Sequence, residues 1–317
     1  MPVTEESKST IKEETQPASA EGGSASGGDE PQTQTKEVSP EELSLEVEEK
    51  ELFYQMMEAG VFYGRSKSKT NPLTRKYILT TRSGVEVINL QSAIKHLKEA
   101  AEVLKKVMAD KGLVLFVGTS PAAKSVIRGV AERLESPFVT ERWLGGTLTN
   151  FKTIKDRIDY FKKLKDDKET GELEKYTKKE QLKMSKELAK LDKLFGGIER
   201  LDKMPALLFI ADLVKNEYAA REAKQKGIPI IAFLNTDADP KLVDHPIPAN
   251  DKNRESIKLL MKYLEEAANE GKMQAAMKKE EVQARTDADQ TQTDKKEKKT
   301  EERAKEETVP NAVKEEK

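Results

Sequence analysis

The sequence contains no cysteine, which excludes disulfide bonds and metal sites built from thiolates. The chain therefore fits a reducing compartment. Histidine is also scarce, with only His96 and His245 in 317 residues. Neither is accompanied by a candidate nucleophile or by metal-ligand spacing, so we predict no hydrolase triad, no bound metal and no cofactor.

Long apolar runs are missing as well. No stretch approaches the roughly 18 apolar residues that a membrane-spanning helix needs. The N-terminus is acidic and polar, and it lacks the basic start and apolar run of a secretory signal peptide. We therefore expect a cytoplasmic protein without a membrane partner.

Net charge is nearly absent, because 56 basic residues are balanced by 57 acidic ones. This balance ordinarily argues against a nucleic-acid partner, unless the charges are segregated along the chain. Residues 60–83 are segregated in this way, since they hold several basic residues and no acidic one. Basic side chains on one surface can neutralise phosphates. The candidate phosphate-binding residues of this segment are Arg65, Lys67, Lys69, Arg75, Lys76 and Arg82.

Segments with very few apolar residues lie at both ends of the chain. Residues 1–38 and 272–317 have compositions that cannot bury enough apolar surface to repay the entropy of ordering, so we predict two disordered tails. Between them, residues 39–271 form the predicted globular domain. Its first helix is expected to start at Ser39, where a capping box is possible, and to stop at Gly60.

Short apolar segments alternate with helical patterns through most of this domain. Because these segments lack a polar face, they are typical of strands buried on both sides. The pattern predicts an α/β fold with a doubly wound, mostly parallel sheet and helices on both faces, a three-layer arrangement of the Rossmann or flavodoxin kind. The predicted strands are 113–117, 138–140, 206–211 and 228–234, with a separate hairpin at 77–81 and 85–89 and a final helix at about 254–269.

Residues 151–195 depart from this alternation. They contain two helical patterns with a polar break near residues 166–171. Phe151, Ile154, Ile158 and Phe161 form an apolar stripe on the first helix, and the second carries a matching stripe. We predict an inserted antiparallel helical hairpin that packs its own seam.

The segment 142–151, which holds the only tryptophan, precedes this hairpin. Gly145 and Gly146 favour a sharp turn. Side chains at Thr147, Thr149 and Asn150 are placed to cap the helix that follows, and its free N–H groups could bind a phosphate. Arg142 and Lys152 add positive charge. The alternative is a turn with a buried Trp anchor and a capped helix.

Two further segments carry weaker chemical signals. Residues 118–125 follow a strand and open a helix like a phosphate-binding P-loop, but Ala123 stands where a P-loop needs glycine. A nucleotide hydrolase is therefore an alternative of low weight. The acidic residues within 235–251 could collect a divalent ion, but Pro240, Pro246 and Pro248 favour a turn-rich connection capped by Asp oxygens.

Three of these segments, 58–65, 142–151 and 235–251, together resemble the bacterial-type family of small-subunit ribosomal protein S2. Phe62 and Arg65 replace the family's usual histidines, so any role of those histidines, including metal binding, is not carried over. The resemblance implies a non-catalytic protein on the back of the 30S subunit with a coiled-coil insertion. Its implied partners are 16S-type rRNA and neighbouring ribosomal proteins, including ribosomal protein S1.

If the resemblance holds, the phosphate groups bound by the candidate residues are those of RNA. Besides the basic residues of the 60–83 segment, these are Arg142, Thr147, Thr149, Asn150 and Lys152. A protein-interaction scaffold that uses the helical hairpin as its contact remains the other alternative to RNA binding.

Overall fold

The computed structural model describes residues 47–277. The predicted N-terminal tail, the predicted helix start at Ser39 and most of the predicted C-terminal tail lie outside the described residues. Helix α1 (Val47–Glu58) ends as predicted just before Gly60, whose φ of 68° favours glycine.

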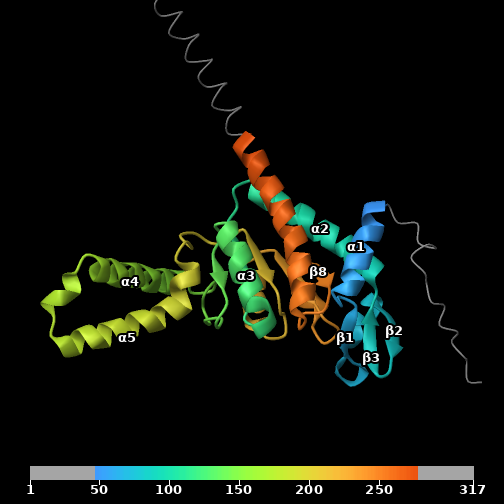
Figure 1. Cartoon of the computed structure of the whole chain (residues 1–317), viewed down its shortest axis with the longest axis horizontal. Helices are drawn as coiled ribbons and strands as arrows, with labels where there is room; N and C mark the ends of the chain where they lie inside the picture. The colour runs from blue at the N-terminus through green and yellow to red at the C-terminus, as the bar shows by residue number, and fades with distance from the viewer. Residues whose placement is uncertain (1–46, 278–317) are drawn as a thin grey trace, which may run out of the picture. The chain divides into compact units, whose positions relative to one another are not determined.

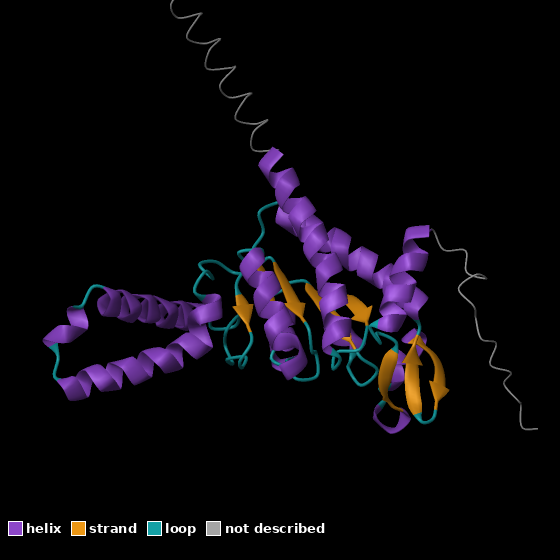
Figure 2. Ribbon diagram, in the orientation of Figure 1, coloured by secondary structure: helices purple, strands orange, loops and turns teal. Residues whose placement is uncertain are grey.

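A five-stranded sheet forms the centre of the domain (Figures 1 and 2). Its strands are β4 (Val114–Val117), β5 (Phe138–Val139), β6 (Leu207–Ile210), β7 (Ile230–Leu234) and β8 (His245–Pro248). They are all parallel and lie in the order β5-β4-β6-β7-β8. The chain places β5 on one side of β4 and then adds β6, β7 and β8 on the other side. This single change of direction is typical of a doubly wound sheet, so the predicted parallel α/β architecture is confirmed.

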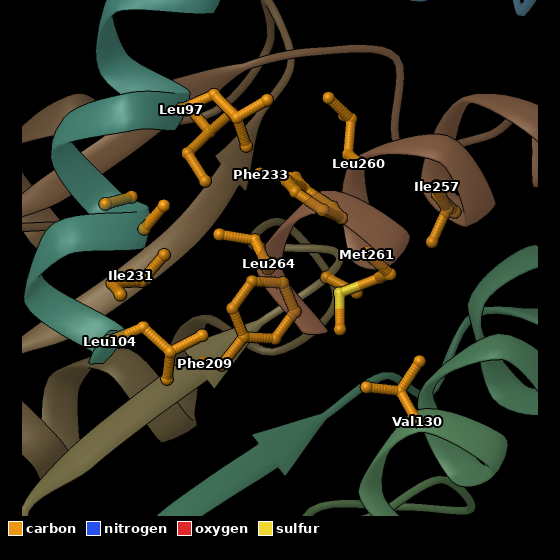
Figure 3. Packing of buried hydrophobic residues seen from close by; sticks show 14 of the residues in the cluster. Leu97, Leu104, Val130, Phe209, Ile231, Phe233, Ile257, Leu260, Met261 and Leu264 are labelled. Atoms are coloured by element: carbon orange, nitrogen blue, oxygen red, sulfur yellow. The ribbon is translucent and has the colours of Figure 1, made fainter. Parts of the chain in front are cut away.

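Side chains on the central strands alternate between two buried clusters, because successive residues of a strand point to opposite faces. Phe209, Ile231 and Phe233 face the cluster shown in Figure 3. There they meet α2 (Leu90–Ala109), α3 (Pro121–Arg133) and the C-terminal helix, residues 254–277. The opposite cluster contains Leu208, Ile210 and Ile230 together with side chains of α4 (Phe151–Glu169), α5 (Lys178–Phe195) and α6 (Glu217–Gln225). Helices therefore cover both faces of the sheet.

Strand β8 was not expected, because its segment was interpreted as a turn-rich connection. It contains Pro246 and Pro248, yet it pairs with β7 from Ile231 to Leu234. Proline lacks the N–H that an inner strand needs, but an edge strand can carry it. Since β8 is the outermost strand of the sheet, its prolines are compatible with a strand.

A second, antiparallel sheet lies between α1 and α2 in the sequence. It comprises β1 (Tyr63–Ser66), β2 (Ile78–Arg82) and β3 (Val85–Ile88) in the order β1-β3-β2. The β2–β3 hairpin was predicted at 77–81 and 85–89, on either side of a short polar turn. Strand β1 was not predicted, because its sequence Tyr-Gly-Arg-Ser shows no alternation of apolar and polar residues.

Helices α4 and α5 occupy the region of the predicted hairpin. They contact each other, and the 3₁₀ helix η4 (Glu172–Lys175) lies in the connection between them (Figure 1). Ile154, Ile158, Phe161 and Leu164 are the buried residues of α4. In α5 the buried residues are Leu188 and Phe195, so the predicted stripes coincide with the buried faces.

The C-terminal helix is longer than predicted. Instead of ending near Asn269 it continues to residue 277, the last described position. Lys272 Nζ donates a hydrogen bond to the carbonyl oxygen of Leu134 at 2.7 Å, and Ala275 is buried. The ordered fold therefore extends past residue 271. None of the helices in residues 47–277 is both long and apolar enough to cross a membrane.

Two glycines in helices offer a test of this packing. A Cβ added at Gly271 would overlap the carbonyl oxygen of Lys105 on α2, whereas one at Gly129 would meet only Arg133 Nη1 at 3.4 Å. We expect Gly271→Ala to lower the free energy of unfolding by about 1–3 kcal/mol through overpacking. Gly129→Ala should raise it by roughly 0.5–1 kcal/mol through helix propensity. Urea unfolding monitored by circular dichroism checks both, and equal effects would contradict a close α2 contact at Gly271.

Candidate nucleic-acid interface

Most basic residues of the 60–83 segment lie in the connection between β1 and β2 of the small sheet. Lys67 and Lys69 belong to the 3₁₀ helix η2 (Lys67–Lys69), and Arg75 and Lys76 to the 3₁₀ helix η3 (Pro72–Tyr77). Arg82 ends β2. All five side chains are exposed. We call them the basic sheet surface.

Backbone hydrogen bonds position this surface. The Lys67 N–H donates to the carbonyl oxygen of Gly84 at 2.9 Å, which ties η2 to the β2–β3 turn. The Asn71 N–H donates to the carbonyl oxygen of Thr236 at 2.8 Å, just beyond the end of β7. The two 3₁₀ helices are therefore anchored between the small sheet and the central sheet, and their lysines and arginines project from a fixed backbone.

Arg65 has a different environment from the other basic residues of the segment. Its Nε lies 3.0 Å from Asp237 Oδ2 and its Nη2 lies 2.9 Å from Asp251 Oδ1. Only 20% of its side chain is exposed. The guanidinium thus joins β1 to the loops after β7 and β8, and its donors are directed into the fold rather than toward a phosphate.

Asp251 belongs to a buried network of carboxylates and cations. Its side chain is 2% exposed and accepts a hydrogen bond from Asn235 Nδ2 at 2.8 Å. Burial raises the pKa of Asp251 above its ordinary value, and the charge of Asp212 acts in the same direction, while Arg65 and Lys252 oppose the increase. Lys252 Nζ lies 2.9 Å from Asp212 Oδ2. These internal ion pairs, rather than an external ligand, hold the loops together.

Other aspartates of the 235–251 segment cap backbone N–H groups, as predicted. Asp239 Oδ1 accepts from the Lys241 N–H at 2.9 Å, and Asp244 Oδ2 accepts from the Ile230 N–H at 2.9 Å. Within residues 47–277 no group of three or more histidine, aspartate or glutamate side chains is arranged to hold a metal ion.

The loop before α4 is organised by Glu222, a residue of α6. Its Oε1 accepts from the indole Nε1 of Trp143 at 3.0 Å and from the Gly146 N–H at 2.9 Å. Its Oε2 accepts from the N–H groups of Leu148 at 3.0 Å and Thr149 at 3.2 Å, and from the Thr149 hydroxyl. We call this set of contacts the Glu222 latch. The N–H groups of Gly146, Leu148 and Thr149, in the loop just before α4, therefore already hold a carboxylate of the same chain.

The predicted side-chain caps of α4 are wrong. Asn150 is the N-cap residue but makes no capping hydrogen bond, and its Oδ1 accepts from the Thr153 hydroxyl instead. The buried Thr147 donates its hydroxyl to the carbonyl oxygen of Leu144 at 2.6 Å. Among the candidates of the 142–152 segment, Arg142, Asn150 and Lys152 are exposed. No local pattern could reveal Glu222, because it lies more than seventy residues further along the chain.

The latch also fixes the protonation of Glu222. Burial alone would raise its pKa, but the hydrogen bonds from Trp143, Gly146, Leu148 and Thr149 together hold the pKa below the ordinary glutamate value. The carboxylate is therefore stabilised in its charged form.

The P-loop-like segment serves packing rather than phosphate binding. Ser120 Oγ caps α3 by accepting from the Ala123 N–H at 3.3 Å, and a Cβ at Gly118 would lie 2.6 Å from Ile127 Cγ1. Lys124 Nζ lies 2.8 Å from Glu141 Oε2 at the surface. The charged partner of this lysine in the structure is therefore a carboxylate of the same chain.

These features define a doubly wound α/β protein whose candidate site is an exposed basic surface. Its sequence matches the family model described as Ribosomal protein S2 over residues 56–271. The small ribosomal subunit protein uS2 of Roseiflexus castenholzii is 42% identical over 217 residues, covering 68% of this chain and 82% of that protein. The uS2 proteins of Dictyoglomus thermophilum (42% over 221 residues, 70% and 90% covered) and Fusobacterium nucleatum (43% over 218 residues, 68% and 88% covered) are similarly close. The chain belongs to the ribosomal protein S2 family.

The Glu222 latch predicts a pH-dependent contribution to stability. Because the folded-state pKa is depressed, the stabilisation is complete above the ordinary glutamate pKa of about 4.3 and is lost as the pH falls through the folded-state value. Glu222→Gln should cost about 1–3 kcal/mol of unfolding free energy at neutral pH, and less in acid. Glu217→Gln, on the same helix in an exposed pair with Arg221, should cost under about 0.5 kcal/mol. Urea unfolding across pH checks this, and a pH-independent loss would refute it.

Arg65 should matter for stability far more than its exposed neighbours. Arg65→Ala leaves Asp237 and Asp251 without their shared cation and should cost about 3–5 kcal/mol. Arg75→Ala, on the exposed basic sheet surface, should change the free energy of unfolding by no more than about 0.5 kcal/mol. Equal effects in denaturant unfolding would show that the Arg65 network carries no more energy than a surface charge.

Proposed function

We propose that this protein is a structural constituent of the small ribosomal subunit in the cytoplasm and that it binds the subunit's rRNA through exposed lysines and arginines. Family membership carries the first part, since the related proteins bear the name small ribosomal subunit protein uS2. The second part rests on the basic sheet surface. A structural, non-enzymatic role agrees with the packing function of the P-loop-like segment.

The proposed rRNA contacts are the predicted basic residues whose side chains are exposed. On the basic sheet surface these are Lys67, Lys69, Arg75, Lys76 and Arg82, and near α4 they are Arg142 and Lys152. Because lysine and arginine mainly hold backbone phosphates, the interaction should depend on salt and on RNA shape more than on base identity. Arg65 is paired with Asp237 and Asp251, whereas Thr147 and Thr149 hold the separate loop before α4, where Asn150 is exposed.

Helices α4 and α5 form, in this proposal, an antiparallel coiled coil inserted in the domain at 151–195. Support comes from the buried residues Ile154, Ile158, Phe161 and Leu164 of α4, which recur at spacings of three and four. Leu188 and Phe195 of α5 lie seven positions apart, one heptad. A hairpin that buries its own seam leaves charged outer faces for contacts with neighbouring small-subunit proteins. We further propose ribosomal protein S1 as one partner, on the family resemblance alone.

The proposed domain organisation follows the same division. The sequence predicts a globular domain of residues 39–271 that contains the inserted hairpin, flanked by charged tails at 1–38 and 272–317. We place the C-terminal boundary later, after the final helix, because Lys272 donates a hydrogen bond to the Leu134 carbonyl and Ala275 is buried.

Charge reversal tests the rRNA-binding surface. We expect Lys67→Glu, Lys69→Glu and Arg75→Glu together to displace the tagged protein from the 30S peak of a sucrose gradient at moderate salt. Each lost phosphate contact should also reduce the salt dependence of binding to small-subunit rRNA transcripts, by on the order of one unit in the logarithmic slope. Arg65 is left intact, because its replacement would unfold the surface rather than discharge it.

A matched variant reverses the same number of charges on the exposed face of α5, with Lys183→Glu, Lys186→Glu and Lys190→Glu. This variant should remain in the 30S peak, because the loss of protein contacts at α5 leaves the proposed rRNA contacts in place. The opposite result, with the α5 variant displaced and the sheet variant retained, would favour the interaction-scaffold alternative. Wild-type protein at the top of the gradient at both low and high salt would refute the ribosomal role.

A further inference from the structure

A cavity of about 520 Å³ opens beside the start of α4. Its apolar wall includes Phe151, Met204 and Ile228. Lys152 and Lys226 line it as well, together with the polar side chains of Thr149 and Asn150. Because this hollow is largely open to solvent, it can receive one group of a larger ligand.

The Glu222 latch makes one wall of this cavity rigid. Leu148 and Thr149 both donate their N–H groups to the Glu222 carboxylate, so the backbone that lines the cavity is held before any ligand arrives. The N–H groups of Leu148 and Thr149 are therefore occupied by Glu222. A ligand at this wall meets the apolar surface and the lysine side chains rather than these two N–H groups.

The two lysines of the cavity differ from nearby lysines in their ion pairing. Lys124, Lys162 and Lys165 lie within 4.0 Å of carboxylates of Glu141, Asp202 and Glu199. In the described part of the chain, Lys152 and Lys226 have no such partner, and no acidic side chain lines the cavity. They come from different elements, the first turn of α4 and the C-cap of α6. Their positive charge is thus left for an external anion.

The cavity is separate from the other charged regions. Met204 precedes β6 and Ile228 precedes β7, so the cavity lies at the amino-terminal edge of the sheet. The Arg65 network lies at the carboxyl-terminal edge, where Asp237 follows β7 and Asp251 follows β8. Variants of the cavity can therefore be made without disturbing that network.

We infer that this cavity holds one unpaired nucleotide of an RNA strand, a role that rests on and refines the proposed rRNA binding. The base lies against Phe151 and the Met204 thioether, and Lys152 and Lys226 hold the phosphates on either side of it. Bases outside a helix stack on aromatic side chains, and this contact tolerates any base. The absence of acidic lining favours RNA over a neighbouring protein segment.

The experiment measures binding of full-length protein to fluorescent RNA strands of about ten nucleotides, a length within the usual site size for single strands. One strand has mixed sequence, and its partner has the same backbone with abasic sugars. The protein carries the three charge reversals of the basic sheet surface, so that this surface does not dominate. We expect about tenfold tighter binding of the strand that carries bases, the value of one stacked base.

Variants test separately the residue that contacts the base and the two lysines that hold the phosphates. Met204→Ala should remove most of the preference for bases without changing binding of the abasic strand, while Met204→Leu keeps the preference. Lys152→Ala with Lys226→Ala should weaken both strands by a similar factor. Urea unfolding midpoints equal to that of the parent confirm that the variants are folded.

The inference is overturned if the abasic strand binds as tightly as the complete one, or if Met204→Ala leaves the preference intact. A protein that enters the 30S peak but shows no base preference would refute the cavity assignment alone. One that prefers bases but never enters the peak would refute the ribosomal role alone. In subunits labelled with a photoreactive uridine, an adduct on the peptide of Met204 supports the inference, and a cross-link there to a protein only overturns it.

Discussion

The arrangement around α4 depends on the Glu222 carboxylate, which accepts hydrogen bonds from five donors. One side chain of α6 satisfies the Trp143 indole, the N–H groups of Gly146, Leu148 and Thr149, and the Thr149 hydroxyl. The loop consequently turns at one place, where Gly146 has a φ of 89°. The point at which α4 leaves the sheet, and with it the base of the α4–α5 pair, follows from this single carboxylate.

Positive charge has two distinct environments in this protein. Arg65 and Lys252 compensate carboxylates that burial would otherwise destabilise, since Asp212 and Asp251 are almost completely buried. The lysines and arginines of the basic sheet surface, only a few residues from Arg65, remain exposed. A chain with almost no net charge can therefore present a positive surface, because part of its acidic charge is neutralised inside the fold and part lies elsewhere in the sequence.

Local patterns in the sequence were sufficient for most elements of the fold. The apolar runs at β4, β6 and β7 and the periodicity of α4 predicted their elements closely, because burial imposes these patterns directly. The failures involved partners distant in sequence. Strand β8 is a strand only because β7 lies beside it, and Arg65 is internal only because Asp237 and Asp251 fold onto it. No pattern near residues 142–151 indicates that Glu222 binds this loop. The sequence of the loop alone therefore resembled an unoccupied anion-binding site.

The prolines of β8 have a consequence for the protein before it assembles. The Ala249 N–H donates inward to the carbonyl oxygen of Leu234, so the alternation of the strand directs positions 246 and 248 outward. Both are prolines and have no N–H to offer to an incoming strand. A free sheet edge is a template for intermolecular pairing, and proline at outward positions prevents it. The prolines thereby disfavour intermolecular pairing at this edge of the newly synthesised chain, even before α2 packs against β8.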